Sequence, residues 1–413
     1  MGFSHESTST NAAEKSTLET SNVRRSFDLR TSTSFDGLVP VLAMITPKLS
    51  KILPESDRIA ATTAIISAQV LVPTFRSKAF PENITKPTLD LVIALGSIPE
   101  AAKTWKRDVT ESFNDPKFFA GSLTLVETGW MPILRQWVLS DKERMLELIS
   151  RLTSPTAAGL VFGVGASSAR LEADRKTQLN LRRIALLILA AVDDTFVVNL
   201  TGLQEKLIDL MNATSASSPS SVTRAEIYLV IRALVLKTSA IHLSSFWPTI
   251  NSELHDALSS AFPLESQDIM DASCLLQACK LLDTLLTLGL DDFQMHEWLF
   301  ITDTTDAVYR PQDYSSTALV DELAEGLDSS NGGSHTYTNS LTNITSTGKR
   351  RPLLSSIVTK DINKEEIMEH VLRPFFRQLS IFAFESTYSM EAPDWKACYD
   401  DLVADLFDDS TLV

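Results

Sequence analysis

The stretch SSARLEADRKTQLNLRRIALLILAAV, Ser167–Val192, is the longest segment with a helical pattern in this chain of 413 residues. Its first half is charged, and its second half is apolar on nearly every side of a helix. A helix that is apolar all round has to be covered by other elements over most of its surface. The stretch therefore predicts a central helix within a helical protein.

Similar segments lie on both sides of this stretch. From Leu38 onward, helical segments of roughly 12 to 20 residues follow one another and are split by Pro and polar turns. We find no convincing strand alternation and no Asn-Gly or Asp-Gly hairpin signal. This succession predicts an all-α fold, an α-solenoid of HEAT- or armadillo-like helical hairpins. Because a strict repeat is not visible, a compact helical bundle is the alternative.

Composition divides the chain into four parts. Residues 1–35 are rich in Ser, Thr and charge and are predicted to be disordered, and residues 36–328 are predicted to form the helical-repeat domain. Residues 329–361 are predicted to be a flexible linker, because most of this stretch is polar and aperiodic. Residues 362–413 are apolar and helical again. They should dock back on the main body, because large exposed apolar patches are rare.

The charge and cysteine content limit the classes of function. The formal net charge is −15, whereas nucleic-acid binding needs clustered Lys and Arg that neutralise phosphates, so nucleic acid is not an expected partner. Cys274, Cys279 and Cys398 do not have the number or spacing of a disulfide framework or zinc site. They are predicted to be small core thiols. The longest apolar run, Ile184–Val192, is much shorter than the roughly 20 residues of a membrane span.

The best candidate for acid–base chemistry is DDFQMHEWLFITDTTDAVYRPQDY, Asp291–Tyr314. A hydrolase or transferase site could use the polar residues His296, Glu297, Asp303 and Arg310. The sequence offers no zinc-binding pair of histidines, phosphate loop or nucleophile elbow to accompany them. We therefore expect no enzyme, no metal and no cofactor. Five residues of the block are instead predicted to form core: Trp298, Leu299, Phe300, Ile301 and Tyr309.

Basic residues gather in two groups that could face a lipid surface or an acidic partner. The first group is Arg170, Arg175, Lys176, Arg182 and Arg183, and the second is Lys349, Arg350 and Arg351. A solvated, ion-paired helix face is the alternative for the first group. The second group ends the predicted linker and should be free to reach a surface. Each cation close to an anionic membrane contributes about 1 kcal/mol, so weak contact with an anionic phosphoinositide is expected.

Four blocks of this sequence carry a family resemblance: ILRQWVLSDKERMLELISRL (Ile133–Leu152), GVGASSARLEADRKTQLNLRRIA (Gly163–Ala185), LLQACKLLDTLLTLGLDDFQMHEWLFITDTTDAVYRPQDY (Leu275–Tyr314) and VLRPFFRQLSIFAFESTYSM (Val371–Met390). They resemble the C-terminal region of fungal members of the Dopey family. The likeness is collinear from about Leu38 to Val413. Family members are much longer, so the chain is expected to be a fragment, a truncated gene model or an isolated C-terminal module.

The resemblance implies a non-enzymatic, peripheral scaffold on the cytosolic face of Golgi, trans-Golgi network and endosome membranes. It implies a role in endosome-to-Golgi recycling and Golgi organisation. The implied partners are an Arf-exchange-factor-related Golgi scaffold and a P-type ATPase lipid flippase, and self-association is a further option. The alternatives are an enzyme of unknown class that uses the 296–310 cluster, or a helical-repeat adaptor outside membrane traffic.

Overall fold

Nearly all regular structure in the described part of the chain is helical. The computed structural model describes residues 37–153, 166–212, 221–261, 272–301, 318–320, 322–324, 348–355, 366–388, 391–408 and 412. Within these ranges, the strands β1 (Lys349–Arg350) and β2 (Ala392–Pro393) pair in parallel, and the other elements are helices. The predicted all-α class is confirmed.

The chain divides into two compact units, which we describe separately. Unit 1 comprises Met1–Phe118 and Thr124–Ile133, and unit 2 comprises Phe119–Leu123 and Leu134–Val413. The boundaries predicted from composition, at residues 35, 328 and 361, all fall outside the described residues and stay predictions.

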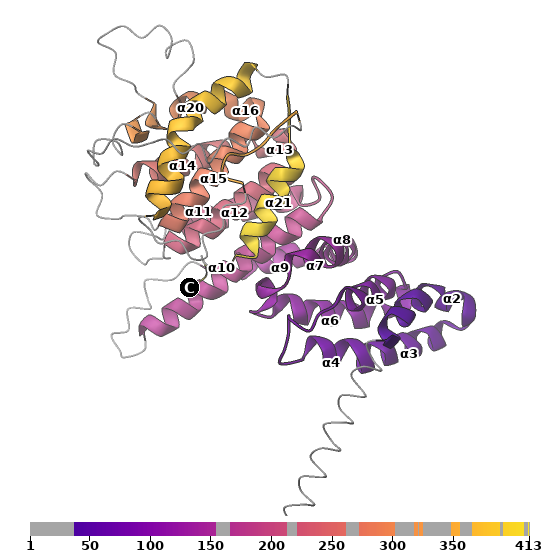
Figure 1. Ribbon diagram of the computed structural model, residues 1–413. Coiled ribbons are helices and arrows are strands. Elements are labelled where there is room, and N and C mark those ends of the chain that lie inside the picture. Colours follow the sequence, from indigo (N-terminus) through magenta and orange to yellow (C-terminus); the bar gives the residue numbers. More distant parts are fainter. Residues whose placement is uncertain are drawn as a thin grey trace, which may run out of the picture. The chain divides into compact units, whose positions relative to one another are not determined.

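Unit 1 is built from short helices (Figure 1). Residues 37–45 are helical. The following elements are η1 (Thr46–Lys48), α2 (Leu49–Ile52), α3 (Ser56–Ile66), η2 (Ser67–Leu71), α4 (Val72–Phe75), α5 (Lys86–Gly96), η3 (Pro99–Ala101), α6 (Ala102–Asn114), α7 (Leu123–Leu125, whose first residue belongs to unit 2) and η5 (Val126–Trp130). Helix α5 packs against α6 and η5. A Cβ added at Gly129 would overlap the side chain of Leu89, so glycine allows η5 to approach α5 this closely.

One continuous helical stretch of the described residues, Ser56–Phe75, is long and apolar enough to cross a membrane by length and composition. It comprises α3, η2 and α4, and 39% of its apolar window is buried within the protein. The hydroxyl of Ser67, within this stretch, donates a hydrogen bond to the buried carboxylate of Asp108 on α6. Core helices of water-soluble proteins pass the same test, so length and composition alone are weak evidence for a span.

Unit 2 contains the long helices. They are α8 (Met131–Ser140, whose first three residues belong to unit 1), α9 (Arg144–Ser150), α10 (Ala166–Ala190), α11 (Leu200–Asn212), α12 (Ser221–Lys237), α14 (Trp247–Ser259) and α15 (Ala272–Leu288). Helix α12 lies between α10 and α15 and packs against both (Figure 1). Helix α11 packs on α9 and α12, and α14 packs on α15. The apolar second half of α10 is buried beneath these neighbours, as its composition predicted.

Polar contacts between successive parts of unit 2 recur at a nearly constant sequence separation. Three hydrogen-bonded pairs, separated by 44 or 45 residues, are Arg182–Glu226, Asp194–Ser239 and Trp247–Asp292. Repeats of HEAT and armadillo type have a period of about 40–47 residues. The predicted helical-repeat architecture is therefore visible in the contacts, although the sequence shows no strict repeat.

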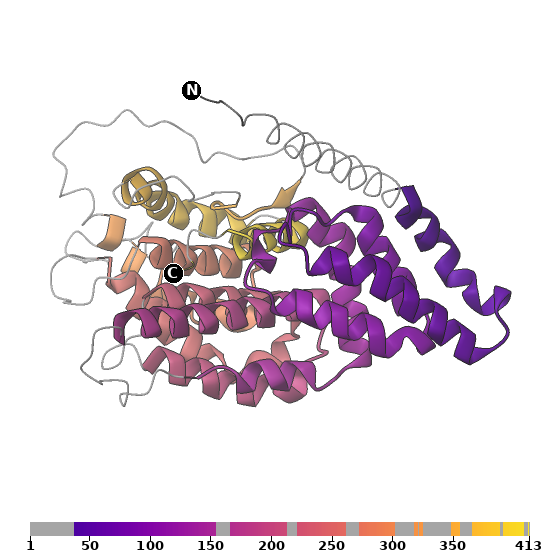
Figure 2. The same cartoon turned by 90° about the horizontal axis from the view of Figure 1, so that it is seen from below.

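The C-terminal helices complete unit 2. They are η9 (Ile367–Leu372), α20 (Arg373–Tyr388) and α21 (Trp395–Leu406). Helix η9 packs on α15, and α21 packs on α10 and α12. Figures 1 and 2 both show α21, in yellow, lying over the pink helices of the repeats. The side chain of Asp394 caps α21 by accepting a hydrogen bond from the amide of Ala397 at 3.2 Å.

A buried group of charged side chains joins α21 to the repeats, and we call it the ionic cluster. Its members are Arg182, Glu226, Arg232, Lys280, Asp401 and Asp405, all of which are buried. Arg232 binds Asp401 at 2.6 Å and Asp405 at 2.5 Å. Lys280 binds the same two carboxylates at 3.3 and 2.6 Å.

A second part of the ionic cluster ties α10 to α12 and α21. Arg182 donates two hydrogen bonds of 2.8 Å to Glu226 and a third, also 2.8 Å, to the carbonyl oxygen of Leu406. Burial alone would lower the pKa of Lys280, but Asp405 and Asp401 outweigh this effect and raise its pKa above the ordinary value. Lys280 is therefore charged at neutral pH, and the cluster contains three basic and three acidic side chains.

Replacing Lys280 with Met should destabilise unit 2 strongly. The change leaves Asp401 and Asp405 buried with a single cation, and breaking a buried ion pair from one side costs about 3–5 kcal/mol. The matched control is Lys396→Met, because Lys396 pairs with Asp400 on the exposed side of α21. A surface pair of that kind contributes about 0–1 kcal/mol. Urea titration gives both free energies of unfolding, and equal losses would contradict the assigned role of the cluster.

Candidate interaction site

The structure divides the basic group predicted on α10. Arg175 and Lys176 are exposed, and Lys176 pairs with Glu172 at 2.7 Å. Arg182 and Arg183 are buried, so the prediction that they face a lipid or a partner is wrong. The physical reason is that their helix enters the core at this point: Arg182 belongs to the ionic cluster, and Arg183 donates to the side chain of Asn180 at 3.0 Å. The side chain of Arg170 lies outside the described residues.

The triplet Lys349–Arg351 was predicted to be free at the end of a linker, and this prediction is also wrong. Arg350 donates to the carbonyl oxygen of Thr287 at 2.6 Å and to that of Ser386 at 2.9 Å. Arg351 pairs with Asp394, the cap of α21, at 2.8 Å. Together with the pairing of β1 and β2, these contacts fix the segment to the body of unit 2. Of the three cations, Lys349 is the exposed one.

Asp283 on α15 holds the same segment. Its carboxylate accepts a hydrogen bond of 2.7 Å from the amide of Leu354. Burial raises the pKa of Asp283 from 3.8 to about 7, although the amides of Leu354 and Leu353 act in the opposite direction. Near neutral pH this carboxyl group is therefore partly protonated.

The signature block Asp291–Tyr314 is only partly core. Phe300 and Ile301 are buried, whereas Trp298 is 65% exposed and Leu299 is half-buried, so predicting burial for the whole run was wrong. Phe300 stacks on Phe293 with ring centroids 6.1 Å apart, and these two rings fill the space beneath the turn. The short helix η8 (Glu297–Leu299) carries Trp298 on its outer side.

The remaining candidates of this block are only partly described. His296 and Glu297 are half-buried neighbours at the start of η8. Asp303 and Arg310 of the proposed catalytic group, and the predicted core residue Tyr309, lie outside the described residues, so the acid–base hypothesis for this block stays a prediction.

Three successive turns of unit 2 form a continuous edge, which we call the turn ridge. It comprises residues 191–199, 237–247 and 289–299, and it includes the short helices η7 (Val197–Asn199), α13 (Ala240–Leu243) and α16 (Asp291–Gln294). The first turn is bonded to the second, because Lys237 pairs with Asp193 and the amide of Asp194 donates to the carbonyl oxygen of Lys237 at 3.0 Å. The second turn is bonded to the third, because the indole of Trp247 donates to Asp292 at 3.1 Å.

Asp194 fixes the first of these turns. It has a positive φ of 61°, a left-handed conformation that Asp tolerates better than most residues. Its carboxylate accepts hydrogen bonds from the hydroxyl and the amide of Ser239, and these bonds lower the pKa of Asp194.

Large apolar side chains are exposed on all three turns of the ridge. They are Val192 and Val198 on the first turn, Ile241 on the second, and Met295 and Trp298 on the third. Val198 is 90% exposed and Ile241 79% exposed, so neither contributes to the core. Sequence reasoning identified none of the five as exposed, and it predicted Trp298 to be core. One feature of the sequence could have predicted this exposure: these apolar residues lie beside turn-forming Asp, Thr and Ser and do not follow helical spacing.

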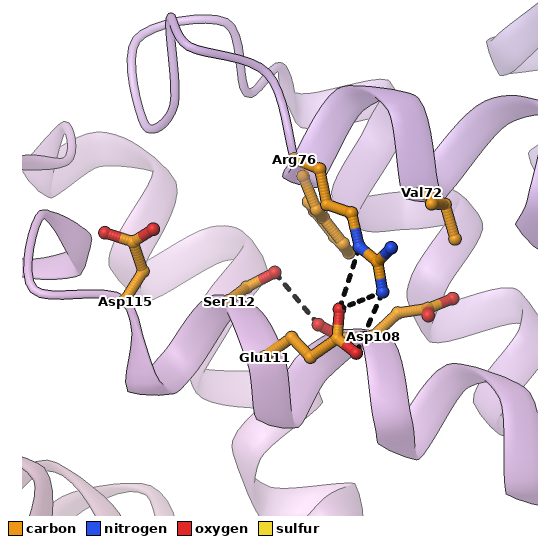
Figure 3. A pocket seen from close by; sticks show the side chains of 7 residues that line it. Val72, Arg76, Asp108, Glu111, Ser112 and Asp115 are labelled. Carbon is orange, nitrogen blue, oxygen red and sulfur yellow. Dashed lines mark hydrogen bonds and ion pairs between the residues drawn. The ribbon is translucent and has the colours of Figure 1, made fainter.

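Unit 1 carries a shallow pocket of about 120 Å³ between α4 and α6 (Figure 3). Arg76 crosses it and binds Glu111 through two nitrogens, at 2.7 and 3.0 Å. Asp108, in its wall, accepts hydrogen bonds from Ser67 and Arg107. Each of these polar groups already has a partner within unit 1, so we interpret the pocket as a packing feature of unit 1.

Neither metal nor thiol chemistry has support among the described residues. No group of three His, Cys, Asp or Glu side chains there is placed to hold a metal ion. Cys274, Cys279 and Cys398 are all buried and form no disulfide, which confirms the prediction of core thiols. Burial raises the pKa of Cys398 to about 12, so this thiol stays protonated at neutral pH.

Phe300 and Trp298 provide a matched test of the signature block. Phe300→Ala should cost about 3–5 kcal/mol, because it empties a buried aromatic site. Trp298→Ala should change the free energy of unfolding by less than about 1 kcal/mol, since exposed substitutions rarely do more. Urea titrations of both variants measure the difference, and a larger loss for Trp298→Ala would contradict the arrangement.

Asp283 should make the stability of unit 2 depend on pH. Its folded-state pKa is raised, so the stabilisation from the bound proton is complete below pH 3.8 and is lost as pH rises to about 7. Asp283→Asn keeps an oxygen acceptor for Leu354 and cannot ionise. The melting temperature of this variant minus that of the native chain should therefore increase as pH rises from 3.8 to about 7. Above that range the difference should stay constant. Asp400→Asn is the exposed control. A difference that is constant with pH would contradict the assignment.

Comparison with known proteins identifies the family. Residues 6–389 match the protein family described as DOP1 C-terminal. Protein dop1 of Emericella nidulans is 49% identical over 377 residues, which cover 91% of this chain and 20% of that protein. Protein DOP1 of Saccharomyces cerevisiae is 28% identical over 361 residues, which cover 85% of this chain and 20% of that protein.

A vertebrate relative is more distant. Protein DOP1B of Mus musculus is 23% identical over 350 residues, which cover 76% of this chain and 14% of that protein. No solved structure matches the chain. The chain spans about a fifth of the length of the two fungal relatives. Since the family match covers most of its residues, the chain belongs to the Dopey family and corresponds to the DOP1 C-terminal region.

Proposed function

We propose that this chain is a non-enzymatic interaction module of a scaffold in Golgi–endosome membrane traffic. The proposed setting is the cytosolic face of Golgi, trans-Golgi network and endosome membranes. The proposed partners are an Arf-exchange-factor-related Golgi scaffold and a P-type lipid flippase. The turn ridge is the observation that carries the interaction role, and family membership is what suggests the pathway.

The turn ridge has the properties of a preformed binding surface. Its three turns are fixed to one another by the ion pair of Lys237 and by hydrogen bonds that Ser239 and Trp247 donate. Binding to a rigid surface loses less conformational entropy than binding to a mobile one. Exposed apolar side chains on such a surface make the free energy of binding more favourable, because their burial against a partner removes apolar area from water.

The positions of the buried cations in unit 2 also favour a binding role for the chain over a catalytic one. Arg182, Arg232 and Lys280 are each committed to carboxylates within the core, where they join helices. Catalytic acids and bases need access to a substrate within hydrogen-bond reach. The buried charges of unit 2 thus support an architectural role.

Direct membrane contact is a secondary part of the proposal. Among the members of the two predicted basic groups whose side chains the structure describes, Arg175, Lys176 and Lys349 are exposed. At about 1 kcal/mol each near an anionic surface, they supply a weak attraction, and the net charge of −15 opposes it. We therefore propose that protein partners provide most of the recruitment and that phosphoinositide contact is weak.

A chimera tests the proposed function. The matching region of the Emericella nidulans relative is replaced by this chain, and the product carries a fluorescent tag. We expect it to mark Golgi and endosomes, to restore recycling of endosomal cargo, and to co-purify with the two proposed partners. The Lys396→Met chimera is the control for a harmless surface change. A stable chimera that stays diffuse and co-purifies with neither partner would refute the proposal.

A further inference from the structure

We infer that the turn ridge of unit 2 binds a segment of a partner protein that combines apolar side chains with Lys or Arg. This inference deepens the proposed scaffold function, on which it rests, by naming the chemistry of the partner. Two properties of the ridge lead to it, the spacing of its apolar groups and the sign of its charge.

The apolar groups lie on turns that are direct neighbours. Neighbouring packed helices lie about 8–10 Å apart, so three successive turns span about 20 Å. A partner helix of about 13 residues covers that length at 1.5 Å per residue. Ile241 on the middle turn would contact the centre of such a segment. Val198 on one side and Trp298 on the other would contact its ends.

The charge of the ridge is predominantly negative. Five carboxylates lie on the three turns against a single lysine, Lys237: they are Asp193, Asp194, Asp291, Asp292 and Glu297. Asp193 pairs with Lys237, yet its side chain is 72% exposed and can accept further hydrogen bonds. Asp291 is also exposed, whereas Glu297 lies close enough to Arg350 to influence its pKa. Cations flanking the apolar anchors of a partner would match this pattern.

The same charge argues against a membrane as the occupant. Apolar side chains on a ridge could insert between lipids, but the cytoplasmic leaflet is anionic and repels carboxylates at its surface. A protein segment can instead place Lys or Arg beside Asp193 and Asp291 while its apolar residues cover Ile241 and Trp298. Complementary charges of this kind guide binding and exclude wrong partners.

A random peptide library displayed on phage, selected against the full chain, tests the inference. Selected peptides are synthesised, and their affinity is measured for the native chain and for three variants. The Ile241→Ser/Trp298→Ser variant removes apolar anchors, and the Asp193→Asn/Asp291→Asn variant removes exposed charge. Ile381→Ser is the matched control, because Ile381 on α20 is also exposed but lies outside the ridge. Thermal unfolding verifies that all variants are folded.

We expect selected peptides to combine Leu, Ile or Phe with Lys or Arg. Loss of the two apolar anchors should weaken their binding by about tenfold or more. Loss of the two carboxylates should weaken it less and should reduce its dependence on salt. Ile381→Ser should leave the affinity unchanged.

Three results would overturn the inference. They are selected peptides that are mainly acidic, binding that does not depend on the ridge variants, and flotation with neutral liposomes that disappears in Ile241→Ser/Trp298→Ser. The last result would make the ridge a membrane-inserting element. The peptide assay uses only the purified chain, so its outcome is independent of the chimera. A chimera that functions normally alongside a failed selection would leave the proposed function standing and remove the inference alone.

Discussion

The structure of unit 2 depends on the pairing of Arg232 and Lys280 with Asp401 and Asp405. Each of these ions loses several kcal/mol of hydration when it is buried. Their mutual attraction offsets that cost only while both cations face both carboxylates at hydrogen-bond distance. The requirement restricts how α21 can lie on the repeat helices, since a rotated helix would leave buried charges without partners. Apolar contacts alone would tolerate small shifts of the same helix much more easily.

This constraint extends to the surface. Arg182 on α10, Arg232 on α12 and Lys280 on α15 each bind α21, so these three neighbouring helices are all tied to the same C-terminal helix. The turns that follow those helices therefore keep a fixed relation to one another. At the turn ridge, hydrogen bonds between residues 45 positions apart join each turn to the next. A rigid interior and a preformed outer edge are thus two consequences of one arrangement.

The sequence predicted the elements better than it predicted the environment of their charged residues. Helical spacing and the all-apolar half of Ser167–Val192 were sufficient for the fold class, because both reflect local geometry and burial. The environment of Arg182 was not predictable in the same way. An Arg on an apolar helix can reach solvent or pair within the core, and its partners here lie 44 and 224 residues away. Arg350 was misjudged for a related reason, since a strand of two residues leaves no pattern in the sequence. Trp298 was misjudged because a short 3-10 turn does not follow the period of an α-helix.

Hydrogen–deuterium exchange of the α21 amides, followed by mass spectrometry, tests the central role of the ionic cluster most directly. If the cluster joins α21 to the repeats, amides of Trp395–Leu406 should exchange as slowly as those of α12 and α15. All three helices should then open together, and Lys280→Met should accelerate exchange in all of them. Fast exchange in α21 alone, at a rate unaffected by Lys280→Met, would show that this helix opens independently and would contradict the account.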